Sequence, residues 1–103
     1  GLWAQVRLQE AGGGLPKFGE SVTLSCRGSG FNFTNEAILW YRQSPRGRLE
    51  WVSYISSIEG KNIRYGAAVE GRAEISRDNS RSEASLFLRD LRPKDSARYF
   101  CAI

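Results

Sequence analysis

Histidine and methionine are both absent from this sequence of 103 residues. Their absence excludes a serine–histidine–aspartate triad, a histidine-ligated metal and a haem held by histidine or methionine. Only two cysteines are present, whereas a structural zinc site needs about four ligands. The glycines at 12–14 lack the strand-to-helix context of a phosphate-binding loop. The sequence therefore predicts no enzyme, no metal site and no cofactor.

Long apolar runs are also missing, because no segment approaches the roughly 20 residues of a membrane-spanning helix. Acidic residues are in the minority, with 11 Asp and Glu against 15 Lys and Arg. The basic residues are scattered along the chain, whereas a nucleic-acid-binding surface shows clustered cations. We therefore expect neither a membrane span in this segment nor a nucleic-acid partner. The length fits one domain.

What the sequence does contain is a series of short segments in which polar and apolar residues alternate. Turn-forming residues separate them at intervals of roughly 8–12 residues, a spacing typical of all-β sandwiches and barrels. One turn of helix is expected at 92–96. Strands are expected at 6–10, 21–27, 39–43, 49–56, 62–65, 72–77, 84–91 and 97–101.

The alternation also gives the strands an inward face. Every second residue of 22–26 and of 84–88 is apolar or cysteine, which leaves Phe87 facing outward. Cys26 and Cys101 both have inward parity on different strands, so a disulfide between two sheets fits them. Such a bridge implies an oxidising compartment. The alternative is two buried free thiols in a cytosolic protein.

A characteristic spacing relates six residues along the chain: Cys26, Trp40, Leu91, Asp95, Tyr99 and Cys101. This spacing resembles that of an immunoglobulin variable domain. Three stretches, at 5–10 (QVRLQE), 49–53 (LEWVS) and 75–80 (ISRDNS), are similar to an antibody heavy chain in particular. The resemblance covers 5–103 and implies an all-β, V-type, two-sheet antiparallel sandwich with Greek-key topology. Residues 1–4 precede it as an N-terminal extension.

The resemblance implies structural roles for several of these residues. Trp40 is expected to pack against the disulfide, and the Tyr99 hydroxyl to reach a backbone carbonyl upstream. Arg72 and Asp95 match a salt bridge that closes one end of the sandwich. Relative to the family, the chain stops before the third hypervariable loop and the last strand, so we expect a truncated domain.

The family's binding surface is a cluster of loops at one end of the sandwich. The expected loops are 30–39 and 54–64, with Phe31, Phe33 and Ile38 as inward anchors and Arg77 beneath the second loop. Asn32 lies in the glycosylation sequence Asn-Phe-Thr. The candidate antigen-binding residues are Asn35, Glu36, Tyr54, Ser56, Ser57, Glu59, Lys61, Asn62 and Arg64.

A second expected surface is the sheet face that would pair with an antibody light chain, the predicted partner. Tyr41 and Arg48 stand where paired heavy chains usually carry a small apolar residue and glycine. Tyrosine at that position resembles single-domain antibodies, whereas Leu49 and Trp51 favour pairing. The candidate light-chain contacts are Tyr41, Gln43, Leu49, Trp51 and Phe100.

The resemblance thus predicts a secreted or extracellular protein that binds an antigen the sequence does not specify. Two alternatives remain open at this stage. One is a T-cell-receptor-like or solitary immune-receptor variable domain. The other is a cell-adhesion domain of V type, which binds through its sheet face instead of its loops.

Overall fold

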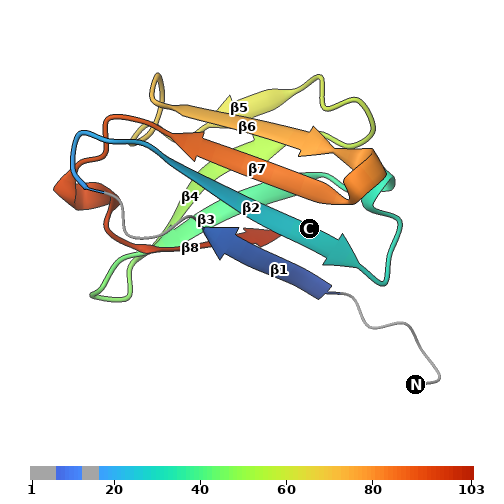
Figure 1. Cartoon of the computed structure of the whole chain (residues 1–103), viewed down its shortest axis with the longest axis horizontal. Helices are drawn as coiled ribbons and strands as arrows, with labels where there is room; N and C mark the ends of the chain where they lie inside the picture. Colours follow the sequence, from blue (N-terminus) through green and yellow to red (C-terminus); the bar gives the residue numbers. More distant parts are fainter. Residues whose placement is uncertain (1–6, 13–16) are drawn as a thin grey trace.

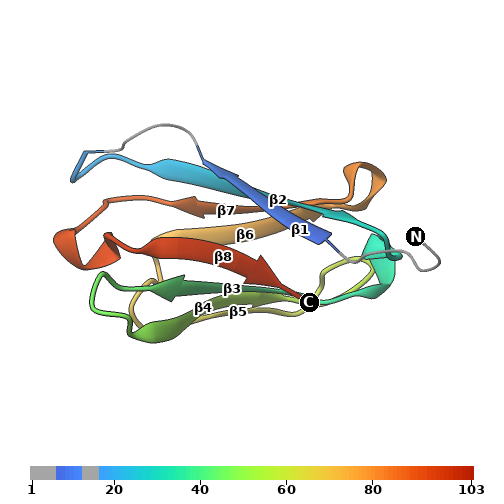
Figure 2. The ribbon, with the colours of Figure 1, turned by 90° about the horizontal axis from the view of Figure 1, so that it is seen from below.

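Two antiparallel sheets packed face to face make up the computed structural model, which describes residues 7–12 and 17–103 (Figures 1 and 2). In strand order, the first sheet contains β1 (Arg7–Gly12), β2 (Val22–Ser29), β7 (Glu83–Leu88) and β6 (Ala73–Asp78). The second contains β5 (Ile63–Tyr65), β4 (Leu49–Ile55), β3 (Ile38–Gln43) and β8 (Arg98–Ala102).

The pairings of β2 with β7 and of β3 with β8 join strands that are far apart in the sequence. Connections must therefore pass from one sheet to the other, as in a Greek key. The predicted V-type antiparallel sandwich is confirmed. Helical structure in the described residues is limited to three 3₁₀ turns: η1 (Phe33–Asn35), η2 (Asn79–Arg81) and η3 (Pro93–Asp95).

The strand predictions hold for the centres of the strands and shift at their ends. The clearest error is the strand expected at 84–91, which ends at Leu88. Asp90 adopts a positive φ of 51°, a left-handed conformation that extended backbone does not accommodate. Leu91 is then turned inward and buried, and its N–H donates to the carbonyl of Glu20 at 3.0 Å. Of the glycines at 12–14, Gly12 ends β1, and 13 and 14 lie outside the described residues.

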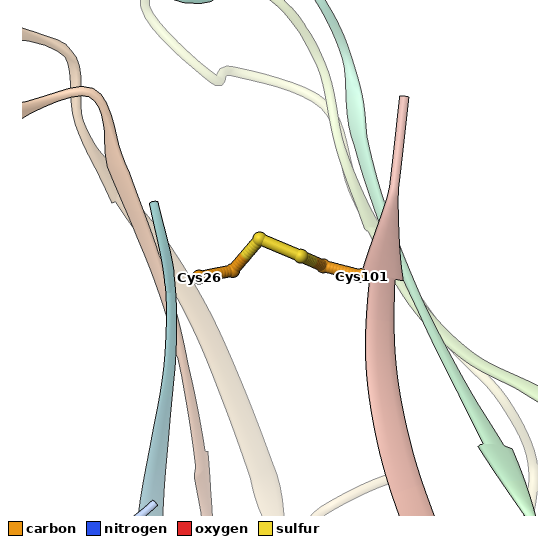
Figure 3. Close-up of a disulfide and its surroundings, with 2 residues drawn as sticks. All are labelled: Cys26 and Cys101. Carbon is orange, nitrogen blue, oxygen red and sulfur yellow. A yellow bond between two sulfur atoms is a disulfide. The ribbon is translucent and has the colours of Figure 1, made fainter. Parts of the chain in front are cut away.

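The core lies between the sheets and follows the predicted parity. Ala84, Leu86 and Leu88 have no exposed surface, whereas Phe87 between them is exposed. The Cys26–Cys101 disulfide links β2 to β8 across this core, with 6.4 Å between the two Cα atoms (Figure 3). Trp40 is fully buried and lies opposite Cys101 in the pairing of β3 with β8. The predicted disulfide is confirmed.

Candidate functional site

The first two loops lie together at one end of the sandwich, to the right in Figure 1. The first loop, 30–37, connects β2 to β3 and contains η1; the second, 56–62, connects β4 to β5. Phe33 and Ile38 are buried and Phe31 packs against the core, as predicted for inward anchors. We call this region the loop end. The η3 turn and the β3–β4 connection lie at the opposite end of the sandwich.

One arginine fastens both loops to the framework. Arg77, on β6, donates hydrogen bonds to the backbone carbonyl of Phe33 at 2.8 Å and to that of Ser56 at 2.6 Å. Its guanidinium also lies over the Phe33 ring, 5.1 Å from the ring centre, and its Nε donates to Asn79 Oδ1 at 2.7 Å. Burial lowers the pKa of Arg77, but an arginine stays charged in proteins. The expected support of the second loop thus extends to the first.

Ile58, at the tip of the second loop, connects the two loops directly. Its N–H donates to the carbonyl of Thr34 at 2.7 Å, and its carbonyl accepts from Asn79 Nδ2 at 2.6 Å. These contacts hold it at a φ of 63°, a strained value for a β-branched residue. Its side chain is nevertheless 56% exposed. Sequence reasoning did not select Ile58 as a contact residue, because its rigid presentation depends on contacts between loops.

Most of the candidate contact residues lie at the loop end. Asn35, Glu36, Glu59, Lys61 and Asn62 are exposed, and Ser56 and Ser57 are half-buried. Lys61 and Glu59 form an exposed ion pair of 3.0 Å, which contributes little to stability. The Ser56 hydroxyl accepts from the Asn62 N–H at 2.9 Å and closes the base of the second loop.

Two of the candidates correct the predicted loop boundaries. Tyr54 and Arg64 belong to β4 and β5, where they are paired with each other. Leu39, expected at the end of the first loop, lies in β3. It pairs with Tyr54 from the opposite side to Arg64. Directly paired residues share one face of a sheet. These three residues therefore form a row on the sheet next to the loop end.

The candidate light-chain contacts also occupy rows of this sheet. Tyr41 pairs with Trp51 on β4 and with Phe100 on β8, and its ring stacks on Phe100 with 5.9 Å between ring centres. Gln43 pairs with Leu49 in the next row. Leu49 is 58% exposed and Trp51 is 37% exposed. We call these five residues the sheet-face cluster.

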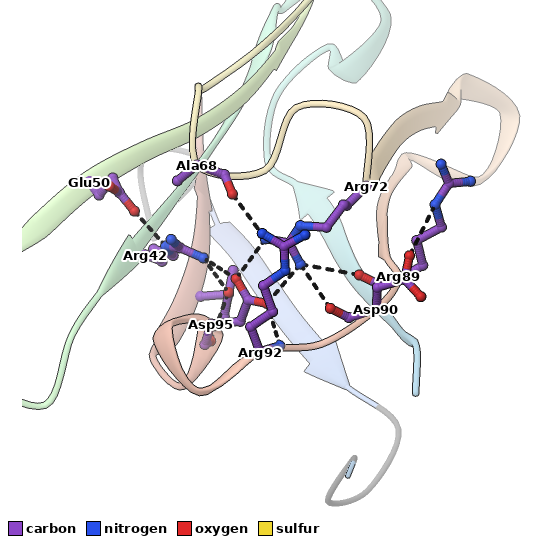
Figure 4. A network of polar contacts seen from close by, with 9 residues as sticks. Arg42, Glu50, Ala68, Arg72, Arg89, Asp90, Arg92 and Asp95 are labelled. Carbon is purple, nitrogen blue, oxygen red and sulfur yellow. Dashed lines mark hydrogen bonds and ion pairs between the residues drawn. The ribbon is translucent and has the colours of Figure 1, made fainter. Parts of the chain in front are cut away.

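The end opposite the loops is closed by a buried carboxylate (Figure 4). Asp95 accepts from Arg72 Nη1 at 2.8 Å, from Arg42 Nη1 at 2.9 Å and from the Arg92 N–H at 2.8 Å. The predicted Arg72–Asp95 salt bridge is present. The Tyr99 hydroxyl donates to the backbone carbonyl of Asp95 at 2.8 Å, as predicted for the upstream carbonyl.

Arg42 was not anticipated as a member of this network. Arg42 is 6% exposed and joins Asp95 to Glu50. The distance between Arg42 Nε and Glu50 Oε1 is 2.6 Å. Burial by itself would raise the pKa of Asp95, but the hydrogen bonds from Arg72, the Arg92 N–H and Arg42 outweigh it and lower the pKa to about 2. The ionised carboxylate is therefore the stable form throughout the neutral range.

The family assignment rests on a model of the immunoglobulin V-set domain, which matches residues 17–103. The chain therefore belongs to the V-set family. Domains of this family are typically non-enzymatic binding domains, and they are typically extracellular or secreted. Among the described residues, no helix is long and apolar enough to cross a membrane.

The depressed pKa of Asp95 predicts how stability depends on pH. A carboxyl that ionises near 3.8 in the unfolded chain and at about 2 in the folded one stabilises the fold at pH values above the unfolded pKa. This contribution, about 2 kcal/mol, is lost as the pH falls from about 4 to about 2. Chemical unfolding followed by tryptophan fluorescence across this range measures it.

Asp95→Asn provides the matched control for that pH dependence. It leaves two buried guanidinium groups without their carboxylate, and we expect it to cost roughly 3–5 kcal/mol at neutral pH. The variant should also lose the part of the acid dependence that Asp95 supplies. An unchanged acid dependence in Asp95→Asn would contradict the assignment to this carboxyl.

The strain at Ile58 predicts that Ile58→Gly stabilises the domain. Glycine adopts a positive φ without steric cost, and strain of this kind amounts to about 1–3 kcal/mol. The greater freedom of glycine in the unfolded chain offsets roughly 0.5–1 kcal/mol of this gain. We expect a higher melting temperature by calorimetry. Ser57→Gly, at a neighbouring residue without a positive φ, should lower it, and a decrease in both variants would contradict the strain.

Proposed function

We propose that this V-set domain, 5–103 with 1–4 as an extension, binds antigen as the variable domain of an antibody heavy chain. Binding is non-covalent and uses the loop end. The observation that carries this proposal is the rigid joining of the two loops: Arg77 donates to both of them, and Ile58 donates to Thr34. Fixed loops with exposed polar tips lose little entropy on binding.

The composition of the loop end supports recognition by shape and polar contact. Tyr54 supplies a rigid aromatic surface, while Asn35, Ser57 and Asn62 supply adaptable hydrogen-bonding groups, the mixture found in antibody combining sites. Glu36 adds an exposed charge. Ile58 adds an exposed apolar side chain on a fixed backbone. We include Ile58 among the contact residues for this reason.

The assignment to a heavy chain rests on the three stretches of sequence and on the sheet-face cluster. Val52 on β4 is buried in the core, whereas Leu49 and Trp51 on the same strand are apolar and exposed. Exposed apolar side chains that lie together mark interfaces. We infer that a light-chain variable domain covers the sheet-face cluster and that the paired molecule is secreted or extracellular.

A second candidate function follows from the stack of Tyr41 on Phe100. This contact covers part of two aromatic rings within the domain itself, and Arg48 adds an exposed charge near Leu49. Both features favour a V-set domain without a light chain, such as a solitary immune receptor. A domain of the adhesion type would instead use the sheet-face cluster as its own binding surface.

A display library tests the loop end as the binding surface. Randomising Asn35, Glu36, Ser57, Glu59 and Lys61 should yield binders to a model antigen such as lysozyme. The matched library randomises exposed residues at the opposite end: Arg46, Arg48, Arg92, Lys94 and Ser96. We expect binders from the first library only. Equal recovery from both libraries would contradict a specialised loop end.

Pairing through the sheet-face cluster predicts the effect of Leu49→Glu. With a co-expressed light-chain variable domain, the wild-type domain should elute from size-exclusion chromatography as a heterodimer. Leu49→Glu places a charge in the apolar contact and should weaken pairing at least about tenfold, as expected for a central interface residue. Phe87→Glu, at an exposed aromatic on the other sheet, should leave pairing unchanged. Absence of a wild-type heterodimer would instead favour the solitary receptor.

A further inference from the structure

One motif of the sequence has no role in antigen binding as proposed above. Asn32-Phe33-Thr34 is an acceptor sequence for N-glycosylation, which requires Ser or Thr two residues after the asparagine. The other three asparagines are Asn35, Asn62 and Asn79, and they are followed at that position by Ala, Arg and Arg. Asn32 is therefore the single acceptor in the printed sequence.

The structure leaves the Asn32 side chain accessible. Asn32 is exposed and immediately precedes η1, yet its side chain makes no capping hydrogen bond to this turn. Its backbone carbonyl accepts from the Asn35 N–H at 3.1 Å. The backbone is thus held in place while the side-chain amide lies in solvent.

The neighbouring residues fix the direction of this side chain. Asn32 has an extended conformation, with φ −82° and ψ 94°, and extended backbone places successive side chains on opposite sides. Phe33 is 3% exposed and lies under the Arg77 guanidinium. Because Phe33 points into the domain, Asn32 points out of it. The burial of Phe33 therefore favours exposure of the acceptor.

A second observation concerns the compartment. The Cys26–Cys101 disulfide joins the two sheets, and disulfides of this kind form in oxidising secretory compartments. N-linked glycans are attached along the same route. The chain therefore combines an exposed acceptor with a covalent bond that forms where the modification takes place.

We propose that Asn32 carries an N-linked glycan at the loop end. The donor is a lipid-linked oligosaccharide diphosphate. The Asn32 amide nitrogen forms a bond to C1 of the first sugar, the C1–phosphate bond breaks, the lipid diphosphate leaves, and the amide loses one proton. No oxidant or reductant takes part. The assignment holds whatever the loops bind.

The glycan has a definite position relative to the loops. Asn32 belongs to the same short loop as Asn35 and Glu36, and the adjacent Thr34 contacts the second loop through Ile58. A bulky, mobile, hydrated group at Asn32 therefore occupies solvent beside both loops. It restricts the approach of a macromolecule from the Asn32 side of the loop end and leaves the buried anchors untouched.

The test is the intact mass of the domain secreted from a mammalian cell line. We expect a mass above that of the polypeptide, which an amidase specific for N-glycans returns to the polypeptide value. Because Asn32 is exposed, release should succeed on the folded, non-reduced protein. A column of a mannose-binding lectin should retain the untreated domain, and free methyl mannoside should elute it by competition. A secreted, disulfide-bonded domain with only the polypeptide mass would overturn the proposal, and release only after denaturation would overturn the exposed position.

Substitutions within the motif supply matched controls. Asn32→Gln and Thr34→Val remove the acceptor sequence and should abolish the added mass, whereas Thr34→Ser retains the sequence and should retain it. Thiol titration and circular dichroism check the fold of each variant. If Asn32→Gln misfolds, the comparison of Thr34→Ser with Thr34→Val still decides. Added mass that persists in Thr34→Val would place the modification elsewhere and overturn the assignment to Asn32.

Discussion

The covalent tie between the two sheets is the constraint on which the other features depend. Cys26 and Cys101 are separated by 75 positions in the sequence, so their bridge closes most of the chain into one loop. In the chain-entropy model, closing a loop of this length reduces the conformational entropy of the unfolded state and stabilises the fold by about 4 kcal/mol. In the folded state the bridge fixes the spacing of β2 and β8 at the centre of the core. At both ends of the sandwich, further contacts must then join the two sheets at the separation that the bridge sets.

The two ends make these contacts by different means. At the η3 end, the buried Asp95 carboxylate is shared by two arginines. Arg42 comes from β3, and Arg72 comes from the turn that precedes β6. This arrangement joins side chain to side chain, so it depends on the identity of each participating residue. At the loop end, Arg77 and Asn79 donate mainly to backbone carbonyls. Backbone carbonyls are present whatever the side chains are, so the loop tips can vary without loss of their support. A binding surface that must accommodate many sequences needs this kind of attachment.

Local periodicity was enough to predict the strand interiors, because parity depends on neighbouring residues alone. The inward series Ala84, Leu86 and Leu88 and the inward cysteines could be read in this way. The end of β7 could not, since it depends on the left-handed conformation of Asp90. Tyr54 and Arg64 lay within strands expected from the periodicity, and it was the loop boundaries 54–64 implied by the family resemblance that were too wide. Arg42 was missed although its parity with Trp40 was an available signal, because a charged residue at an inward position was not expected to be buried.

Ile58 illustrates a stronger limit of sequence reasoning. Its conformation is set by Thr34 and Asn79, which are distant from it in the chain. No pattern within 56–62 indicates that a β-branched residue there is held at a positive φ with its side chain in solvent. The conformation of Ile58 is determined only by the contacts that form between the loops in the folded domain. Contact residues at the loop end are therefore less predictable than the anchors, whose apolar character is visible in the sequence.

The arginine content acquires a different meaning once these contacts are known. Twelve of the 15 basic residues are arginine, whose guanidinium favours forked contacts with carboxylates or phosphates. Arg42 and Arg72 are buried against Asp95, and Arg77 is committed to loop carbonyls. Arg89 donates to the Gly71 carbonyl beside this network. The guanidinium groups of Arg42, Arg72 and Arg77 serve as cross-links with several donors each. Part of the arginine content therefore serves the structure, while the other basic residues of 17–103 are exposed on the surface.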